Sequence, residues 1–312
     1  MVTVTSLDPT QNAPSSLAGK VILITGGTSG LGAASALALA RLGPSRIYIS
    51  GRRSSAAAAI IAQIETLSSN TVSALFLPCD LADLSSVNAA AEHILKHESR
   101  LDVLLANAGV AAVAPGRTKD GYEVHFGTNH VGHALLVRKL LPLLQAAEGR
   151  VVSLTSFSFR AAIWGIPFDK VRSEGNEGIG MGDYLMIWRW MRYAESKLAN
   201  VVYARELAKR YPEVLSVSVS PGFVETEMVS GMRLCDRLGT RALGYLAGGM
   251  VKPEEGALNQ IWAATAERGE LTNGAVYEPV GVVCANMGGP ATDPRVGDQL
   301  WEWTEKELSS WL

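Results

Sequence analysis

Tyr193 and Lys197 are the two residues whose spacing points most directly to chemistry. They stand four residues apart in the run Tyr193-Ala194-Glu195-Ser196-Lys197, and residues four apart lie on one face of a helix. An ammonium group near a phenol lowers the pKa of the phenol, so that the phenol can serve as an acid or base near neutral pH. The pattern also occurs by chance, and the alternative is an ordinary exposed helix face.

A glycine-rich turn near the N-terminus could hold an anion. The aliphatic run Val21–Ile24 stops at Thr25-Gly26-Gly27-Thr28-Ser29-Gly30-Leu31-Gly32, and a helical stretch rich in alanine and leucine follows. The N–H groups at the start of a helix attract negative charge, and glycine lets a pyrophosphate approach the backbone closely. The alternative is a glycine-rich connection that binds no ligand.

Two arginines follow the second expected strand, in Ser50-Gly51-Arg52-Arg53. In a dinucleotide-binding fold this strand end meets the adenosine ribose, where a carboxylate would select NAD. No carboxylate is present in this run, and guanidinium groups pair well with phosphate. The run therefore predicts NADP(H) as the cofactor, unless both arginines are only solvated surface charges.

Strands and helices alternate along the chain. Aliphatic runs predict strands at 21–25, 46–50, 72–77, 101–106, 150–155, 214–219 and 275–278. Intervening segments predict helices at 33–42, 54–67, 83–98, 122–144, 191–210, 253–266 and 296–308. This alternation predicts an α/β fold, a single Rossmann-type doubly wound parallel sheet with helices on both faces. We expect a flexible segment at residues 1–18 and one dinucleotide-binding catalytic domain at residues 19–312.

Taken together, these residues resemble the classical short-chain dehydrogenase/reductase family, over about residues 20–225. The branch that looks most similar contains retinol dehydrogenases and reductases of fungal secondary metabolism. The motif Thr25-Gly26-x-x-x-Gly30-x-Gly32 matches the cofactor loop of the family, and Tyr193 with Lys197 matches its catalytic pair. The remaining matches are Asp80 for the adenine ring, Asn107-Ala108-Gly109 for the central sheet, Asn129 for the helix asparagine, and Ser220-Pro221-Gly222 with Thr226 for the nicotinamide carboxamide.

The family's catalytic serine is assigned by its place at the end of a strand. Ser153, Thr155 and Ser156 all lie near the end of the fifth strand. The family ends this strand with two small hydroxyl residues and uses the second, which is Ser156. The resemblance thus implies the catalytic residues Asn129, Ser156, Tyr193 and Lys197. It implies a cofactor site made of Thr25, Gly26, Thr28, Ser29, Gly30, Leu31, Gly32, Arg52, Arg53, Asp80, Leu81, Asn107, Ala108, Gly109, Tyr193, Lys197, Pro221, Gly222, Val224 and Thr226.

The reaction that the resemblance implies is hydride transfer between NADPH and a ketone or secondary alcohol, with Tyr193 as the acid or base. Ser156 would orient the substrate oxygen, Lys197 would hold the nicotinamide ribose and lower the pKa of Tyr193, and Asn129 would hold a relay water. Two alternatives remain. One is a catalytically silent NADP-binding regulatory protein, and the other is a non-redox epimerase or dehydratase on the same fold.

The spacing between Ser156 and Tyr193 departs from the family, because 37 residues separate them. A long stretch without regular structure is uncommon in a compact domain and is usually functional. We therefore expect residues 157–192, together with residues 223–252, to cover the substrate side. The aromatic residues Phe157, Trp164 and Trp188 predict contact with a hydrophobic compound such as a polyketide, terpenoid or retinoid. The alternative is that these side chains pack in the core or at a subunit interface.

Composition excludes several other classes of function. The net charge is −2, so no basic field predicts nucleic-acid binding. The three cysteines lie far apart, which predicts reduced, buried thiols in a cytoplasmic protein. Of the remaining candidates, His125, His130 and His133 share a helix without nearby cysteines, so we expect packing or surface histidines and no metal. We expect no signal peptide and no transmembrane segment. The sequence is compatible with a homo-oligomer.

Overall fold

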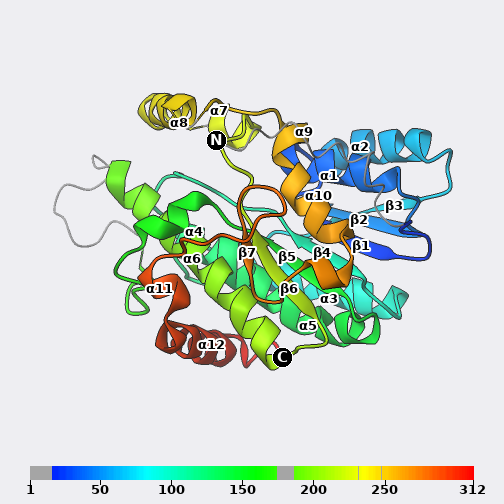
Figure 1. The fold of residues 1–312 in the computed structure, drawn as a ribbon. Coiled ribbons are helices and arrows are strands. Elements are labelled where there is room, and N and C mark those ends of the chain that lie inside the picture. Colours follow the sequence, from blue (N-terminus) through cyan, green and yellow to red (C-terminus); the bar gives the residue numbers. More distant parts are fainter. Residues whose placement is uncertain (1–15, 174–185, 231, 247) are drawn as a thin grey trace.

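The structure is a computed structural model that describes residues 16–173, 186–230, 232–246 and 248–312. Within these residues, seven strands form one parallel sheet in the order β3-β2-β1-β4-β5-β6-β7 (Figure 1). The predicted α/β parallel sheet is confirmed. The strands are β1 (Val21–Thr25), β2 (Arg46–Gly51), β3 (Ser73–Pro78), β4 (Val103–Ala106), β5 (Arg150–Leu154), β6 (Leu215–Val219) and β7 (Val276–Tyr277).

Helices cover both faces of the sheet, as predicted. One apolar core joins one face of the sheet to α3, α5, α6 and α12, and a second core joins the other face to α1, α2 and α10. The longer helices are α1 (Gly30–Ala40), α2 (Ser54–Leu67), α3 (Leu84–His97), α5 (Gly132–Ala146), α6 (Met186–Arg210), α8 (Leu234–Leu246), α10 (Leu258–Thr265) and α12 (Pro294–Leu308). The shorter ones are α4 (Val124–Phe126), η1 (Gly127–Val131), η2 (Phe157–Ala161), α7 (Glu227–Ser230), α9 (Pro253–Gly256), η4 (Arg268–Glu270) and α11 (Gly289–Thr292).

β1 fits between the two layers of helices because its side chains alternate between two buried faces of the sheet. In β1, Leu23 belongs to one core, whereas Ile22 and Ile24 belong to the other, and all three are fully buried. A strand that is buried on both faces must be apolar along its whole length. This is why the unbroken aliphatic run at the start of the chain predicts a central strand.

The strand order reverses beside β1, which lies between β2 and β4. Connections leave the sheet in opposite directions at such a point and open a crevice beyond the carboxyl ends of the strands. The residues that follow β1, β4 and β5, which are Gly26, Asn107 and Thr155, line a pocket at this crevice. The sheet therefore brings together segments that are far apart in the sequence.

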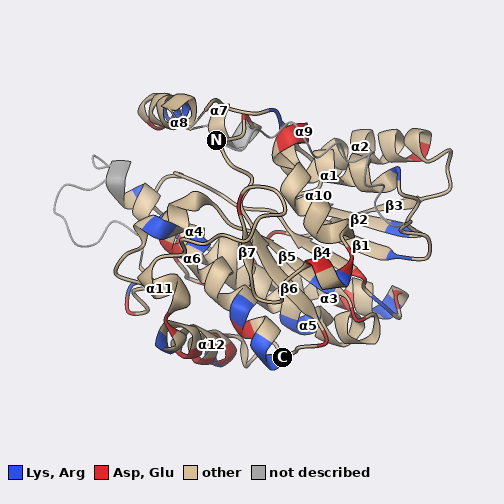
Figure 2. Ribbon diagram, viewed as in Figure 1, with Lys and Arg blue, Asp and Glu red and all other residues tan. Residues whose placement is uncertain are grey.

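Charged side chains lie mostly outside the sheet (Figure 2). The helix α12 and the C-terminal part of α6 carry both signs, and ion pairs such as Arg210–Asp298 join them. Charges of both signs are typical of a solvated surface, and these two helical segments form no large basic patch. Over the residues described, no helix combines the length and the apolar character that a membrane crossing requires.

Three expectations about elements are changed by the structure. The helix expected from Met191 begins at Met186, and the helix expected over 122–144 is interrupted by the π-helical turn η1. Residues 157–192 are not irregular throughout, because η2 and the first turns of α6 lie within them. The flexible segment predicted over residues 1–18 falls mostly outside the described residues, as do residues 174–185 of the insertion.

Candidate active site

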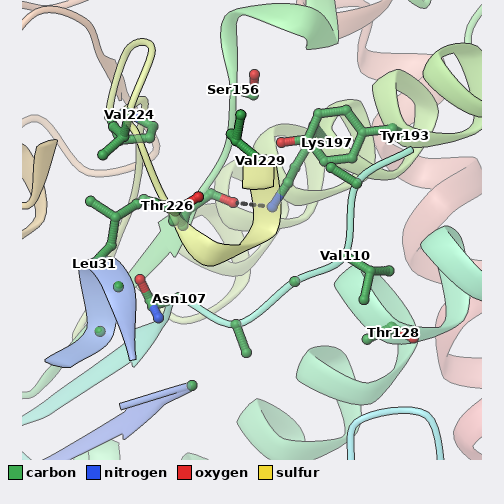
Figure 3. Close-up of a pocket in the computed structure, with 18 of the residues that line it drawn as sticks. Leu31, Asn107, Val110, Thr128, Ser156, Tyr193, Lys197, Val224, Thr226 and Val229 are labelled. Atoms are coloured by element: carbon green, nitrogen blue, oxygen red, sulfur yellow. Dashed lines mark hydrogen bonds between the residues drawn. The ribbon is translucent and has the colours of Figure 1, made fainter. Parts of the chain in front are cut away.

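Ser156, Tyr193 and Lys197 lie together at the carboxyl end of β5. Figure 3 shows the three side chains on the same side of one pocket. The Ser156 hydroxyl lies near the Tyr193 hydroxyl and lowers the pKa of that phenol. Lys197 Nζ lies 5.7 Å from the centroid of the Tyr193 ring and donates to the Leu154 carbonyl oxygen at 2.9 Å. The four-residue spacing on α6 thus places phenol and ammonium side by side.

Burial sets the proton affinities of this pair. Burial raises the pKa of Tyr193 to about 12, although the nearby Ser156 hydroxyl lowers it in part. Burial lowers the pKa of Lys197 to about 8. The expected lowering of the Tyr193 pKa by Lys197 is not seen in this structure, because desolvation of the phenolate is the larger effect.

The other two hydroxyl residues near the end of β5 have different roles. Thr155 donates to the Lys197 carbonyl oxygen at 2.9 Å, so it fastens the strand to α6. Ser153 lines a separate small cavity between the sheet and α5. Of the three, only Ser156 lies beside the Tyr193 hydroxyl, and its catalytic role stays a prediction.

Asn129 occupies the middle of the π-helical turn η1 and is fully buried. Its Oδ1 accepts from the Val110 N–H at 2.8 Å, and its Nδ2 donates to the Val110 carbonyl at 3.0 Å and to Ser196 Oγ at 2.9 Å. A Cβ at Gly109 would lie 3.0 Å from Asn129 Oδ1 and 3.5 Å from Lys197 Nζ. Glycine at that position lets both side chains approach the end of β4.

His133 connects the glycine turn to the turn around Asn129, a role that the sequence did not reveal. Its Nδ1 lies 2.9 Å from the Asn129 carbonyl oxygen, and its Nε2 lies 2.9 Å from Thr25 Oγ1. A carbonyl oxygen only accepts, so Nδ1 carries the proton and Nε2 accepts from Thr25. The Thr25 hydroxyl in turn accepts from the N–H groups of Asn107 and Ala108 at 2.9 Å each.

Replacement of His133 by Asn tests this connection through the pH dependence of stability. Burial lowers the pKa of His133 to about 4 in the folded chain. The unfolded chain therefore binds a proton below about pH 6.5 that the folded chain does not bind, and stability falls as the pH falls. We expect the wild type to lose about 2 kcal/mol more than His133→Asn between pH 6.5 and 5, as measured by urea unfolding.

The control is His97→Asn, because His97 Nδ1 makes the same bond to the carbonyl four residues earlier on an exposed helix face. We expect this control to follow the wild type at both pH values. If His133→Asn also follows the wild type at both values, His133 is not the buried link described above.

The glycine turn has the shape that a pyrophosphate needs. Gly26 and Gly30 have positive φ values of 65° and 52°. A Cβ at Gly32 would lie 2.3 Å from the Gly26 carbonyl oxygen, so no larger residue fits there. Ser29 makes no side-chain cap at the start of α1, which leaves the first N–H groups of this helix directed toward the pocket. The turn fits the phosphates of a dinucleotide.

The pocket has a volume of about 770 Å³ and joins the glycine turn to the side chains of Ser156, Tyr193 and Lys197. Arg52 and Arg53 are exposed at its rim, beyond the end of β2. Thr25 and Asn129 lie behind the lining and support it. The other predicted cofactor residues all line the pocket: Gly26, Thr28, Ser29, Gly30, Leu31, Gly32, Arg52, Arg53, Asp80, Leu81, Asn107, Ala108, Gly109, Tyr193, Lys197, Pro221, Gly222, Val224 and Thr226.

The substrate end of the pocket is apolar, but its aromatic residues are only partly those predicted. Phe157 lines it and packs against Phe223, with ring centroids 4.7 Å apart. Trp164 is 82% exposed and lies outside the lining, as does Trp188. Trp190 takes their place, because α6 begins early enough to turn this side chain toward Tyr193.

The remaining histidines and the cysteines have mainly structural roles. His125 pairs with Glu123 and His130 with Thr304, so both are buried packing residues and not surface residues. Cys79 and Cys284 are buried as predicted, but Cys235 is exposed because it lies on the outer face of α8. Within the described part of the chain, no cluster of three or more His, Cys, Asp or Glu side chains could hold a metal ion.

The fold and pocket define a dinucleotide-binding α/β protein with a Ser-Tyr-Lys site. Comparison with known proteins agrees: residues 20–165 match the family described as "short chain dehydrogenase". A short-chain dehydrogenase/reductase of Armillaria gallica is 33% identical, with 95% of this chain and 92% of that protein covered. Human retinol dehydrogenase 12 is 37% identical, with 84% of this chain and 78% of that protein covered.

A solved structure shows the same fold over nearly the whole chain. A protein from Mycobacterium paratuberculosis superposes with a TM-score of 0.70 at 26% identity, and 96% of each chain is covered. The chain belongs to the short-chain dehydrogenase/reductase family, in its retinol-dehydrogenase-like branch. It is therefore an oxidoreductase that acts on an alcohol or ketone with a nicotinamide cofactor.

Proposed function

We propose that the protein transfers hydride between NADP(H) and a ketone or secondary alcohol of a hydrophobic small molecule. The observation that supports this most strongly is one pocket that holds both the glycine turn with Arg52 and Arg53 and the neighbouring hydroxyl groups of Ser156 and Tyr193. A regulatory protein would need the first of these features and not the second.

The chain's own residues supply position and proton transfer. The nicotinamide, when bound, supplies or accepts the hydride. In the reductive direction, Ser156 donates a hydrogen bond to the substrate oxygen and orients it. Tyr193 then gives its proton to that oxygen, and the ammonium of Lys197 stabilises the phenolate that remains. The ammonium of Lys197 can also donate hydrogen bonds to the ribose hydroxyls of the cofactor.

Proton replacement would proceed through the turn at Asn129. Both N–H groups of its amide are already used, on the Val110 carbonyl and Ser196 Oγ, so a relay water would donate to an oxygen of Asn129. His133 Nδ1 fixes the direction of the main-chain oxygen from behind. Such a water would pass protons to Lys197 and from there to Tyr193.

The hydrophobic nature of the substrate is inferred from the side chains at the catalytic end of the pocket. They comprise aromatic, aliphatic and methionine side chains, with few polar groups among them. The lining there is formed by Phe157, Ala161, Trp190, Met191, Phe223, Val229, Met232 and Leu243. This lining would bind a polyketide-, terpenoid- or retinoid-like carbonyl compound, and the retinol dehydrogenases among the relatives are consistent with it.

The preference for NADP(H) is tested by replacing Arg52 and Arg53 together by Ala. Charged hydrogen bonds from guanidinium groups to the 2′-phosphate are stronger than neutral ones. We expect the dissociation constant for NADPH to rise about tenfold to a hundredfold and that for NADH to change less than about twofold. Fluorescence titration of both cofactors measures this.

The matched control is Arg41→Ala, which removes an exposed arginine beyond the end of α1, outside the pocket lining. We expect it to leave both dissociation constants unchanged. An equal loss of affinity for NADPH and NADH in the double variant would show that the two arginines do not read the 2′-phosphate.

A further inference from the structure

A buried carboxylate on α8 reaches across the substrate end of the pocket. Asp236 is 1% exposed and is part of the pocket lining. Its Oδ2 accepts from Arg189 Nη2 at 2.7 Å, and its Oδ1 accepts from Trp190 Nε1 at 3.0 Å. Both partners belong to the first turns of α6, 46 and 47 residues away in the sequence.

The contact holds the indole of Trp190 in one orientation. The rings of Trp190 and Tyr193 meet edge to face, with centroids 5.8 Å apart and planes at 85°. Both rings line the pocket, so the indole bounds the space next to the reacting hydroxyl. A tryptophan whose N–H has one buried, charged acceptor has little freedom to turn away.

Burial makes the ion pair between Arg189 and Asp236 costly to break. Arg189 is 5% exposed and Asp236 is 1% exposed, so the pair lies outside the reach of bulk water. Removal of Asp236 would take this carboxylate away from the buried guanidinium of Arg189, which is unfavourable. The pair therefore fixes α8 to α6. The indole of Trp190 lies between Asp236 on α8 and Tyr193.

We propose that Asp236 is a positioning residue that fixes Trp190 against Tyr193, and that Trp190 thereby limits the width of the substrate beside its carbonyl group. This inference deepens the proposed function and rests on it. It predicts that the wild-type protein prefers a carbonyl flanked by one flat ring or a slender chain to one flanked by a wider ring system. A purely structural ion pair predicts no such preference.

The test compares two probe ketones, acetophenone and the wider 1-acetonaphthone, by the ratio of their kcat/KM values. We expect the ratio to shift about tenfold toward 1-acetonaphthone in Trp190→Ala, because the indole no longer closes the space. Asp236→Ala should shift it in the same direction, since the indole loses its acceptor. Asp236→Asn keeps an acceptor for Trp190 Nε1 and should stay near the wild-type ratio.

Two controls remove comparable groups outside the pocket. Trp164→Ala deletes an exposed indole, and Arg241→Ala removes an exposed ion pair between α8 and Glu225. Both should leave the ratio and the affinity for NADPH unchanged. If Asp236→Ala does not fold, Trp190→Phe must still shift the ratio of kcat/KM values toward 1-acetonaphthone. The phenyl ring is smaller than the indole and has no N–H to bond Asp236, so it leaves more space beside Tyr193.

A readout that needs no turnover separates this inference from the proposed function. The chain has seven tryptophans, and fluorine NMR of the 5-fluorotryptophan-labelled protein gives each a signal. Trp190→Phe assigns the signal of Trp190. We expect Asp236→Ala to move that signal and Arg241→Ala to leave it in place. If the wild type reduces neither ketone, the proposed function fails while the placement of Trp190 is still decided. An unmoved signal, or an unchanged ratio in a folded Asp236→Ala variant, would overturn the inference.

Discussion

Replacement of Tyr193 by Phe should reduce the turnover number by about 10²–10⁴-fold while NADPH still binds. The variant keeps the ring, which packs edge to face with Trp190 and His125, and removes only the hydroxyl that faces Ser156. Without that hydroxyl, no proton donor of the right geometry meets the substrate oxygen. Steady-state kinetics with acetophenone and fluorescence titration of NADPH measure the two effects separately.

The same helix offers a matched control for this change. Tyr203 lies ten residues further along α6, and its buried hydroxyl has no hydrogen-bond partner within the described structure. Tyr203→Phe therefore makes the same chemical change on the same element and should leave turnover near the wild-type value. Near-normal turnover in Tyr193→Phe would remove the tyrosine from the proposed mechanism.

Replacement of Lys197 by Met should reduce turnover by about a hundredfold or more. The side chain is 3% exposed, so methionine fills a similar volume without the charge. The ammonium then no longer stabilises the phenolate of Tyr193 or donates to the Leu154 carbonyl. Lys209→Met, an exposed lysine on the same helix that pairs with Asp298, is the control and should be nearly neutral.

The pH profile gives a second readout of Lys197. Burial lowers its pKa from the ordinary value of 10.5 to about 8, so the ammonium is lost as the pH rises through 8. In the reductive direction, kcat/KM for NADPH reports the free enzyme and should fall above about pH 8 in the wild type. This fall should be absent in Lys197→Met. A wild-type profile that stays flat to pH 10 would contradict the role given to the ammonium.

Much of the fold follows from local signals in the sequence. The aliphatic runs that end at Gly26 and Asn107 become the buried strands β1 and β4, and the run that ends at Pro78 becomes β3, a half-buried strand at the edge of the sheet. A helix was predicted to begin at residue 83, and the Asp83 carboxylate accepts from the N–H groups of Ser85 and Ser86 at the start of α3. Such strands and caps depend on residues within a few positions of one another, so a single sequence reveals them.

The parts of the site that the sequence missed depend on distant contacts. The first turns of α6 contain aromatic residues of modest helix propensity, and the link from Arg189 and Trp190 to α8 favours the helix there. His133 contacts Thr25 across 108 positions of sequence. Trp164 and Trp190 look alike in sequence, and only the packing shows that one faces solvent and the other the pocket.

Transfer of deuterium from cofactor to product tests the central claim most directly. NADPH deuterated at either the pro-R or the pro-S position of C4 is incubated with the protein and acetophenone or 1-acetonaphthone, and the alcohols are analysed by mass spectrometry. We predict that one of the two labelled cofactors places one deuterium on the carbinol carbon of at least one product, and that Tyr193→Phe shows almost none. Tight binding of NADPH with no labelled alcohol from either cofactor would contradict the proposed reaction.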